Sequence, residues 1–145
     1  MNATEANVKV VLESFSAVER RDDERMQALF HPSVEFHWPP ELPYGGSRAR
    51  GGAEDTPGQT FENVWDPFQP TEAERSMDPR VIGANEREVA VLWRQRGVGP
   101  GGERFDSQVL GLYEVRDGRL ARAQMFYFDP RAVTEFLGRA AGQRA

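Results

Sequence analysis

Two long, mostly apolar runs separated by Asp117 and Gly118 dominate the pattern of the chain between residues 106 and 129. An Asp-Gly pair between such runs is the strongest short-range signal for a hairpin turn. Each run is about ten residues long, near the upper limit of ordinary strands. The pattern therefore predicts a long β-hairpin, which needs other elements to cover one of its faces.

Further strands are predicted before this hairpin. Residues 88–96 contain VAVLW and lead into a glycine-rich turn at residues 97–102. Residues 34–38 alternate apolar and polar positions, and the following two prolines end that strand because proline cannot donate to a ladder. Residues 73–81 give a weaker strand pattern. Residues 39–54, which are rich in Gly and Pro, are predicted to form a loop at the rim of a pocket.

Helical spacing appears at four places in the chain. Apolar positions three and four apart predict a first helix through residues 8–18, opened by Thr4 as its N-cap. Asp22 or Asp23 caps a short second helix that carries Phe30 and ends at Pro32. A third helix is predicted over residues 54–66. A last helix begins at Pro130 and ends near residue 138.

This order of elements predicts one α+β domain over residues 1–145. We expect a conical, curved antiparallel or mixed sheet wrapped around three N-terminal helices, with a short C-terminal helix. Such a cone would hold an apolar interior that is open at one end. A second apolar face on the strands remains uncovered, which predicts a homodimer. That face is predicted to comprise Ala90, Leu92, Leu110 and Leu112.

Composition narrows the classes of partner. The 18 basic and 23 acidic residues give a net charge of −5 and are mixed along the chain, so a nucleic-acid partner is not expected. No apolar run is long enough for a membrane span, and the N-terminus lacks a leader pattern, so we expect a cytoplasmic protein. The chain has no cysteine. His31 and His37 lie on different elements, so neither a metal site nor a cofactor is predicted.

Four short motifs give a resemblance to a known family. They are ALFHPSVEFHWP at residues 28–39, YGG at 44–46, RDGRL at 116–120 and YFDP at 127–130. In this order and spacing they resemble the SnoaL-like branch of the nuclear-transport-factor-2-like superfamily. The resemblance implies a conical α+β barrel, a dimer, and a deep pocket for an apolar small molecule. Its members include polyketide cyclases, ketosteroid isomerase and limonene-epoxide hydrolase.

The catalytic residues of those members are not matched in this sequence. The oxyanion-hole Tyr and Asp of ketosteroid isomerase fall on Ser14 and Gly111, and its base falls on His37 or Trp38. The acidic base of polyketide cyclases also falls on Gly111. The positions of the Asp-Arg-Asp set of limonene-epoxide hydrolase are occupied here by other residue types: Trp93, Gln95 and either Met125 or Phe126. Neither epoxide hydrolysis nor steroid isomerisation is therefore indicated.

His37 and Gln95 are the candidate catalytic residues. An imidazole exchanges protons near neutral pH, and the family resemblance places His37 toward the pocket; the alternative is a half-exposed strand residue. A buried Gln95 could hold a carbonyl, whereas a solvated strand end explains it equally well. The predicted substrate-binding residues, which could instead be ordinary core or surface positions, are Ser14, Phe15, Trp38, Tyr44, Phe61, Trp65, Trp93, Val109, Gly111, Tyr113, Gln124, Met125 and Tyr127.

These observations favour an enzyme of polyketide-like biosynthesis that cyclises an apolar intermediate. A fixed pocket can promote such a reaction by holding a flexible chain in its reactive shape. A Diels–Alder-type cycloaddition and an aldol closure with His37 as base both fit. One alternative is a protein that binds an apolar metabolite without turnover. Another is a structural dimer whose own aromatic residues fill the cone.

Overall fold

The computed structural model describes residues 2–49 and 68–144. The third predicted helix, residues 54–66, lies outside the described residues, and so do the predicted binding residues Phe61 and Trp65. No helix in the described part of the chain is long and apolar enough to cross a membrane.

Two helices at the N-terminus follow the predicted apolar spacing. Helix α1, Ala3–Glu19, begins earlier than expected, because the Asn2 side chain accepts the backbone N–H of Glu5 at 2.8 Å and takes the role predicted for Thr4. Helix α2, Asp23–Leu29, is capped by Asp22, which is one of the two caps that the sequence predicted. Phe30 is extended rather than helical.

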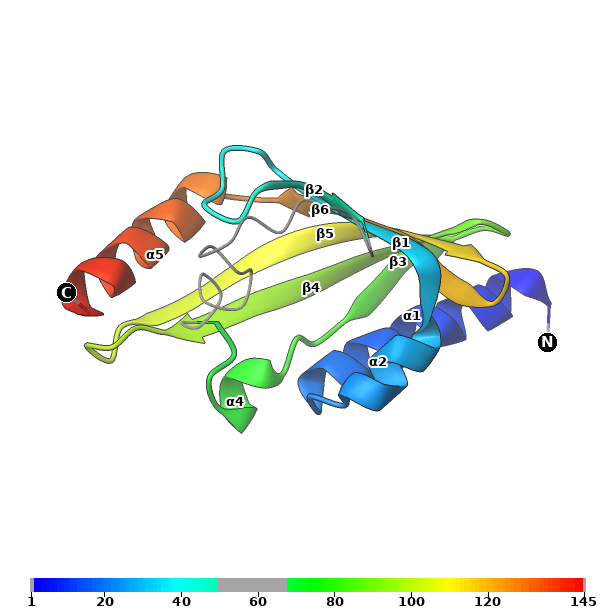
Figure 1. Ribbon diagram of the computed structural model, residues 1–145, viewed down its shortest axis with the longest axis horizontal. Helices are drawn as coiled ribbons and strands as arrows, with labels where there is room; N and C mark the ends of the chain where they lie inside the picture. Colours follow the sequence, from blue (N-terminus) through cyan, green and yellow to red (C-terminus); the bar gives the residue numbers. More distant parts are fainter. Residues whose placement is uncertain (1, 50–67, 145) are drawn as a thin grey trace.

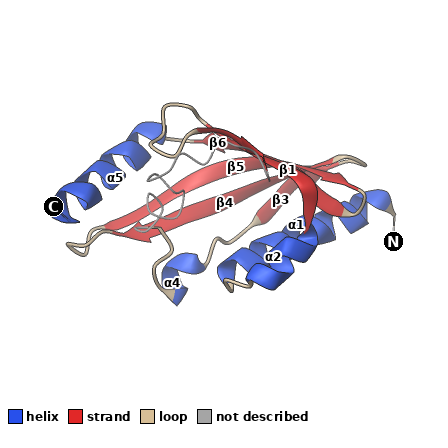
Figure 2. Cartoon of the chain, viewed as in Figure 1, coloured by secondary structure: helices blue, strands red, loops and turns tan. Residues whose placement is uncertain are grey.

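Six strands form one mixed sheet in the order β2-β1-β6-β5-β4-β3 (Figure 2). Strands β1 and β6 pair in parallel, and the other neighbours are antiparallel. The bounds are β1 Phe30–Trp38, β2 Gly46–Ala49, β3 Arg80–Ala84, β4 Glu88–Val98, β5 Arg104–Arg116 and β6 Arg119–Tyr127. The predicted hairpin is confirmed, since Asp117 and Gly118 have φ angles of 55° and 71°, as a type I′ turn requires.

Three elements differ from the sequence prediction. Strand β2 lies inside the predicted loop and pairs with β1. The predicted strand at residues 73–81 is wrong over most of its length, because helix α4, Glu72–Arg75, occupies its start and β3 begins only after Pro79. Helix α5, Pro130–Arg144, continues past Gly138, which is exposed and costs a helix about 1 kcal/mol relative to Ala.

The helices lie on one face of the sheet and at its ends. Helices α1 and α2 lie toward one end of the molecule and α5 lies at the other (Figure 1). On the inner sheet face, the ring of Phe15 from α1 makes edge contacts with Trp93 at 5.9 Å and Tyr113 at 5.5 Å. The α+β class is therefore confirmed, with N-terminal helices on a mixed sheet and a helix at the C-terminus. The conical closure of the sheet stays a prediction.

Candidate functional site

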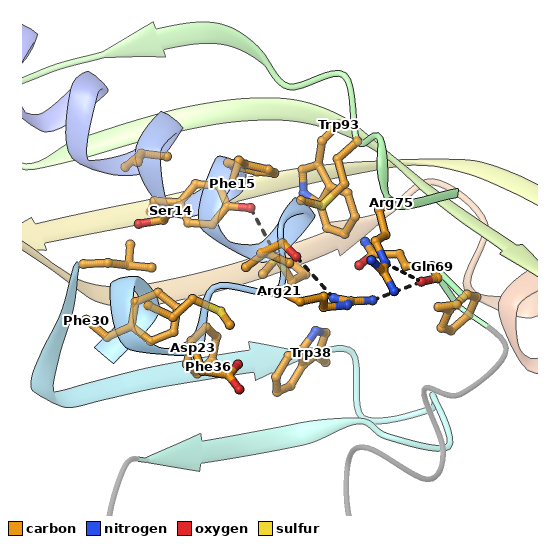
Figure 3. A pocket seen from close by; sticks show the side chains of 18 of the residues that line it. Ser14, Phe15, Arg21, Asp23, Phe30, Phe36, Trp38, Gln69, Arg75 and Trp93 are labelled. Atoms are coloured by element: carbon orange, nitrogen blue, oxygen red, sulfur yellow. Dashed lines mark hydrogen bonds between the residues drawn. The ribbon is translucent and has the colours of Figure 1, made fainter. Parts of the chain in front are cut away.

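A cavity of about 700 Å³ lies between the inner sheet face and the helices α1, α2 and α4 (Figure 3). Most of its wall is apolar, because each surrounding element turns its hydrophobic stripe inward. Helix α1 contributes Val11, Phe15 and Val18, and the sheet contributes Trp93, Tyr113, Leu120 and Met125. A cavity of this size, with few polar groups, is typical of a small-molecule site.

Strand β1 places alternate side chains on opposite faces of the sheet. Phe36 and Trp38 line the cavity, with parallel rings whose centroids are 5.6 Å apart. His37, between them, does not line it. Its Nδ1 is 2.6 Å from Ser47 Oγ on β2, and its Nε2 is 3.5 Å from a carboxylate oxygen of Glu35. The imidazole therefore faces away from the cavity that its neighbours form.

Tyr113 stands where β5 passes under α1. Burial raises the pKa of its hydroxyl, and the nearby Trp93 indole offsets this only in part. The hydroxyl donates to Met125 Sδ at 3.7 Å. Gly111 leaves room for this ring, because a Cβ at that position would overlap it. Ser14 lines the same wall, but its hydroxyl donates to the carbonyl of Val10 at 2.9 Å.

A second group of buried polar residues lies beside the cavity rather than in its wall. The hydroxyl oxygens of Tyr44 and Tyr127 are 2.5 Å apart, and Gln95 Nε2 donates to the Tyr44 hydroxyl at 3.3 Å. Burial and the neighbouring Tyr44 raise the pKa of Tyr127 well above its usual value. The carbonyl oxygen of Gln95 has no hydrogen-bond partner among the described residues. These three side chains tie β4 and β6 to the segment between β1 and β2.

The structure therefore divides the predicted site residues into two sets. Those that line the cavity are Ser14, Phe15, Trp38, Trp93, Tyr113 and Met125. The described residues that do not line it are His37, Gln95, Tyr44, Val109, Gly111, Gln124 and Tyr127. Val109 is fully buried core, and Gln124 lies opposite His37 in the β1–β6 ladder, where its side chain accepts from Arg122 at 3.2 Å.

Five polar residues in the cavity wall were not among the predicted site residues, namely Arg21, Asp23, Arg48, Gln69 and Arg75, and three of them lie close together. Arg21 follows α1, Gln69 precedes α4, and Arg75 ends α4. Figure 3 shows the two arginines reaching toward Gln69 from different elements. Arg21 belongs to a charged stretch that reads as a solvated loop, and Gln69 lies in a proline-flanked segment without periodicity. The run of charged residues at 19–24, between the two helices, is the signal that could have pointed to Arg21.

In the described ranges, no group of three or more His, Asp or Glu side chains is arranged to hold a metal ion. The only carboxylate that lines the described part of the cavity is Asp23. The arrangement can therefore enclose an apolar molecule, contact it with aromatic rings and meet one end of it with guanidinium and amide groups.

Helices on one face of a mixed sheet, with an apolar cavity between helices and sheet, define the α+β class of the chain. The chain belongs to the SnoaL-like domain family, whose model matches residues 11–123. None of the curated proteins compared with the chain matches it.

Solved structures share this fold at low sequence identity. Bal32a from a soil-derived mobile gene cassette is 20% identical with a TM-score of 0.71, covering 94% of this chain and 99% of its own. A putative polyketide cyclase from Xanthomonas campestris pv. campestris is 18% identical with a TM-score of 0.69, covering 96% and 99%. TerC, co-crystallised with polyporic acid, is 18% identical with a TM-score of 0.67, covering 92% and 98%.

Proposed function

We propose that this protein is an enzyme of natural-product biosynthesis that cyclises an apolar, polyketide-like intermediate inside the cavity. The observation that carries the proposal is the cavity itself, about 700 Å³ in volume and walled by aromatic and aliphatic side chains. Removing apolar surface from water contributes about 25 cal/mol per Å² to binding before entropic costs. A structure of the same fold named as a putative polyketide cyclase supports this reading.

The chemistry that best suits such a wall is one that shape can promote. In a Diels–Alder-type cycloaddition two carbon–carbon σ bonds form within one molecule as the three π bonds of the diene and dienophile become one, and no proton enters or leaves. Holding diene and dienophile in contact lowers the barrier by up to about 7–11 kcal/mol in the best cases. Trp38 and Trp93 stand on different walls of the cavity and would constrain a folded polyene between them.

An aldol closure is the second candidate reaction. A base removes a proton next to one carbonyl, the carbanion attacks a second carbonyl, and the resulting alkoxide is protonated. His37 was the predicted base, but its ring faces Ser47 across the β1–β2 pair rather than the cavity. This placement favours the cycloaddition over the aldol reaction with His37.

A pH profile separates the two reactions. If shape alone promotes the cyclisation of a linear polyene, the rate should hardly change between pH about 5.5 and 8.5, since no proton is transferred. This window spans the usual histidine pKa of about 6.5. His37→Ala should then leave the rate within about twofold, like the control His31→Ala. A rate that follows a titration near neutral pH and disappears only in His37→Ala would select the aldol mechanism.

The alternative function is a binding protein for an apolar metabolite. It is favoured by the same wall, which offers one carboxylate, Asp23, and no imidazole among the described residues. Tight binding of polyenes that are recovered unchanged, measured by calorimetry and mass spectrometry, would select it over catalysis.

A further inference from the structure

One end of the cavity contains a buried amide without a partner. Gln69 is fully buried and lines the cavity, yet neither its side-chain oxygen nor its nitrogen makes a hydrogen bond within the described part of the chain. Leaving a buried polar group unsatisfied costs about 1–3 kcal/mol. Natural structures retain such a group where a bound water or ligand satisfies it.

Two guanidinium groups converge on the same residue. Arg21 Nη2 and Arg75 Nε donate to the backbone carbonyl of Gln69 at 3.2 Å and 3.4 Å. Both bonds lie at or beyond the long end of the ordinary range, about 2.7–3.2 Å. A guanidinium has five N–H donors, so most of those on Arg75 make no hydrogen bond to a described residue. The Gln69 carbonyl therefore holds both arginine side chains in place, and further N–H groups remain that could bind a ligand.

The charges at this end are not balanced. Partial loss of hydration and the nearby Arg75 charge lower the pKa of Arg21, and Asp23 opposes this only as the smallest of the three causes. An anion placed between the two guanidinium groups would offset both the repulsion and the lost hydration. Arginine is suited to this task, because its planar group binds a carboxylate through two parallel hydrogen bonds.

We propose that this polar end, formed by Arg21, Gln69 and Arg75, binds the carboxylate of a ligand whose apolar remainder fills the cavity. The inference deepens the proposed function and rests on it only in requiring that the cavity accepts an apolar guest. It specifies the substrate class as an apolar acid, anchored at one end and folded against the aromatic walls. The anchor would fix the orientation in which the chain is presented for ring closure.

A matched pair of fluorescent probes tests this anchor. 1-Pyrenebutyrate and 1-pyrenebutanol have the same apolar body and differ only in the carboxylate. Fluorescence titration of the wild-type protein should give a dissociation constant about tenfold lower for the acid than for the alcohol. Raising the ionic strength from about 0.05 to about 0.5 M should weaken binding of the acid and leave the alcohol unchanged or tighter.

Variants assign the effect to the polar end. Arg75→Met should weaken the acid about tenfold and the alcohol by less than about twofold, and Arg75→Lys should recover part of the loss. Gln69→Leu should also weaken the acid selectively. Arg116→Met, at the exposed end of β5, is the control and should change neither probe. Unchanged alcohol binding shows in each case that the variant is folded.

The outcomes separate the anchor from the cavity. If both probes bind with equal affinity and equal salt dependence, or if Arg75→Met weakens them equally, the anchor is overturned and the proposed function stands. If neither probe binds to the wild-type protein, the apolar cavity itself fails, and the proposed function falls together with the inference.

Discussion

The ring of Tyr113 occupies the space directly over Gly111, where a Cβ atom would overlap the ring carbons and the hydroxyl. The two residues stand on the same face of β5, and Tyr113 also forms part of the cavity wall. A glycine in the middle of a long strand is unfavourable by itself, and here it is explained by the close approach of an aromatic ring. The position of the ring, and with it the shape of the cavity, depends on this missing side chain.

Gly111→Ala should therefore destabilise the protein by about 1–3 kcal/mol, because the Tyr113 ring must move into the cavity. Chemical denaturation would give the free energy, and 1-pyrenebutanol binding should weaken in parallel. Gly83→Ala is the matched control, since a Cβ there meets nothing within 4 Å. In a Tyr113→Ala background the cost of Gly111→Ala should vanish; a cost of the same size would contradict the account.

The buried tyrosines should make the protein sensitive to alkaline pH. Burial raises the pKa of Tyr113 and Tyr127 in the folded state. The stability that these two tyrosines contribute is therefore fully present below pH 10, the usual tyrosine pKa. Above it the unfolded state releases protons that the folded state retains, and stability falls by about 1.4 kcal/mol per pH unit for each group. Denaturation between pH about 10 and 11.5 should show this slope, reduced by about half in Tyr113→Phe.

An equal slope in wild type and Tyr113→Phe would show that the tyrosine hydroxyl is not responsible. Tyr127→Phe should reduce the slope in the same way, and the double variant should show the flattest profile. Stability of the single Tyr113→Phe variant at neutral pH should change little, because the hydrogen bond from its hydroxyl to Met125 Sδ is long, at 3.7 Å.

A surface ion pair should act at the opposite end of the pH range. Arg96 donates to Asp78 at 2.8 Å and lowers the pKa of that carboxyl below its usual 3.8. The contribution is therefore present above pH about 4 and is lost as pH falls through the folded-state pKa. Because Asp78 is exposed, Asp78→Asn should cost less than about 1 kcal/mol at pH 7.

The effect of Asp78→Asn on stability should disappear near pH 2, and it should shrink in high salt. Asn is the appropriate replacement, since Asp78 has a φ of 47° and Asn tolerates that conformation. A difference that persists unchanged at low pH would show that a neutral hydrogen bond, not the charge, holds the segment before β3.

The outer face of the sheet is predicted to pair with a second copy of the chain. Leu110 and Phe126 are cross-strand partners on that face and are 39% and 47% exposed. Leu110→Glu should convert a dimer into a monomer in light scattering, because a charge cannot be buried there without a partner. Leu110→Met should keep the dimer. A monomeric wild-type protein at micromolar concentration would refute the expectation.

Most of the fold could be read from periodicity because the long strands and α1 bury one regular stripe each. The Asp117–Gly118 turn depends on only two residues, so it could be predicted from the local sequence without tertiary contacts. Strand β2 was missed because residues 46–49 lie in a stretch rich in Gly and Pro and show no alternation of apolar positions, although they pair with the nearby β1. Phe30 was wrongly predicted to be helical. It begins β1, because His31 precedes a proline and favours an extended chain from that point.

The candidate site was less accessible to sequence reasoning. The aromatic wall followed from the inward stripes, but β1 turns Phe36 and Trp38 rather than His37 toward the cavity. Arg21 and Gln69 both have left-handed backbone conformations, with φ angles of 57° and 53°. Non-glycine residues rarely adopt them, and no pattern of polar and apolar positions predicts them. Their meeting depends on how separate loops are placed around the sheet.

The parallel pairing of β1 with β6 joins residues 30–37 to residues 120–124. During synthesis on the ribosome, β1 must therefore wait for almost the whole chain before it acquires this neighbour. Until then β1 is not joined to β5 and β4, so the cavity that Phe36 and Trp38 line is incomplete. Polypeptides that stop before β6 should consequently be targets for chaperones and proteases rather than partly active fragments.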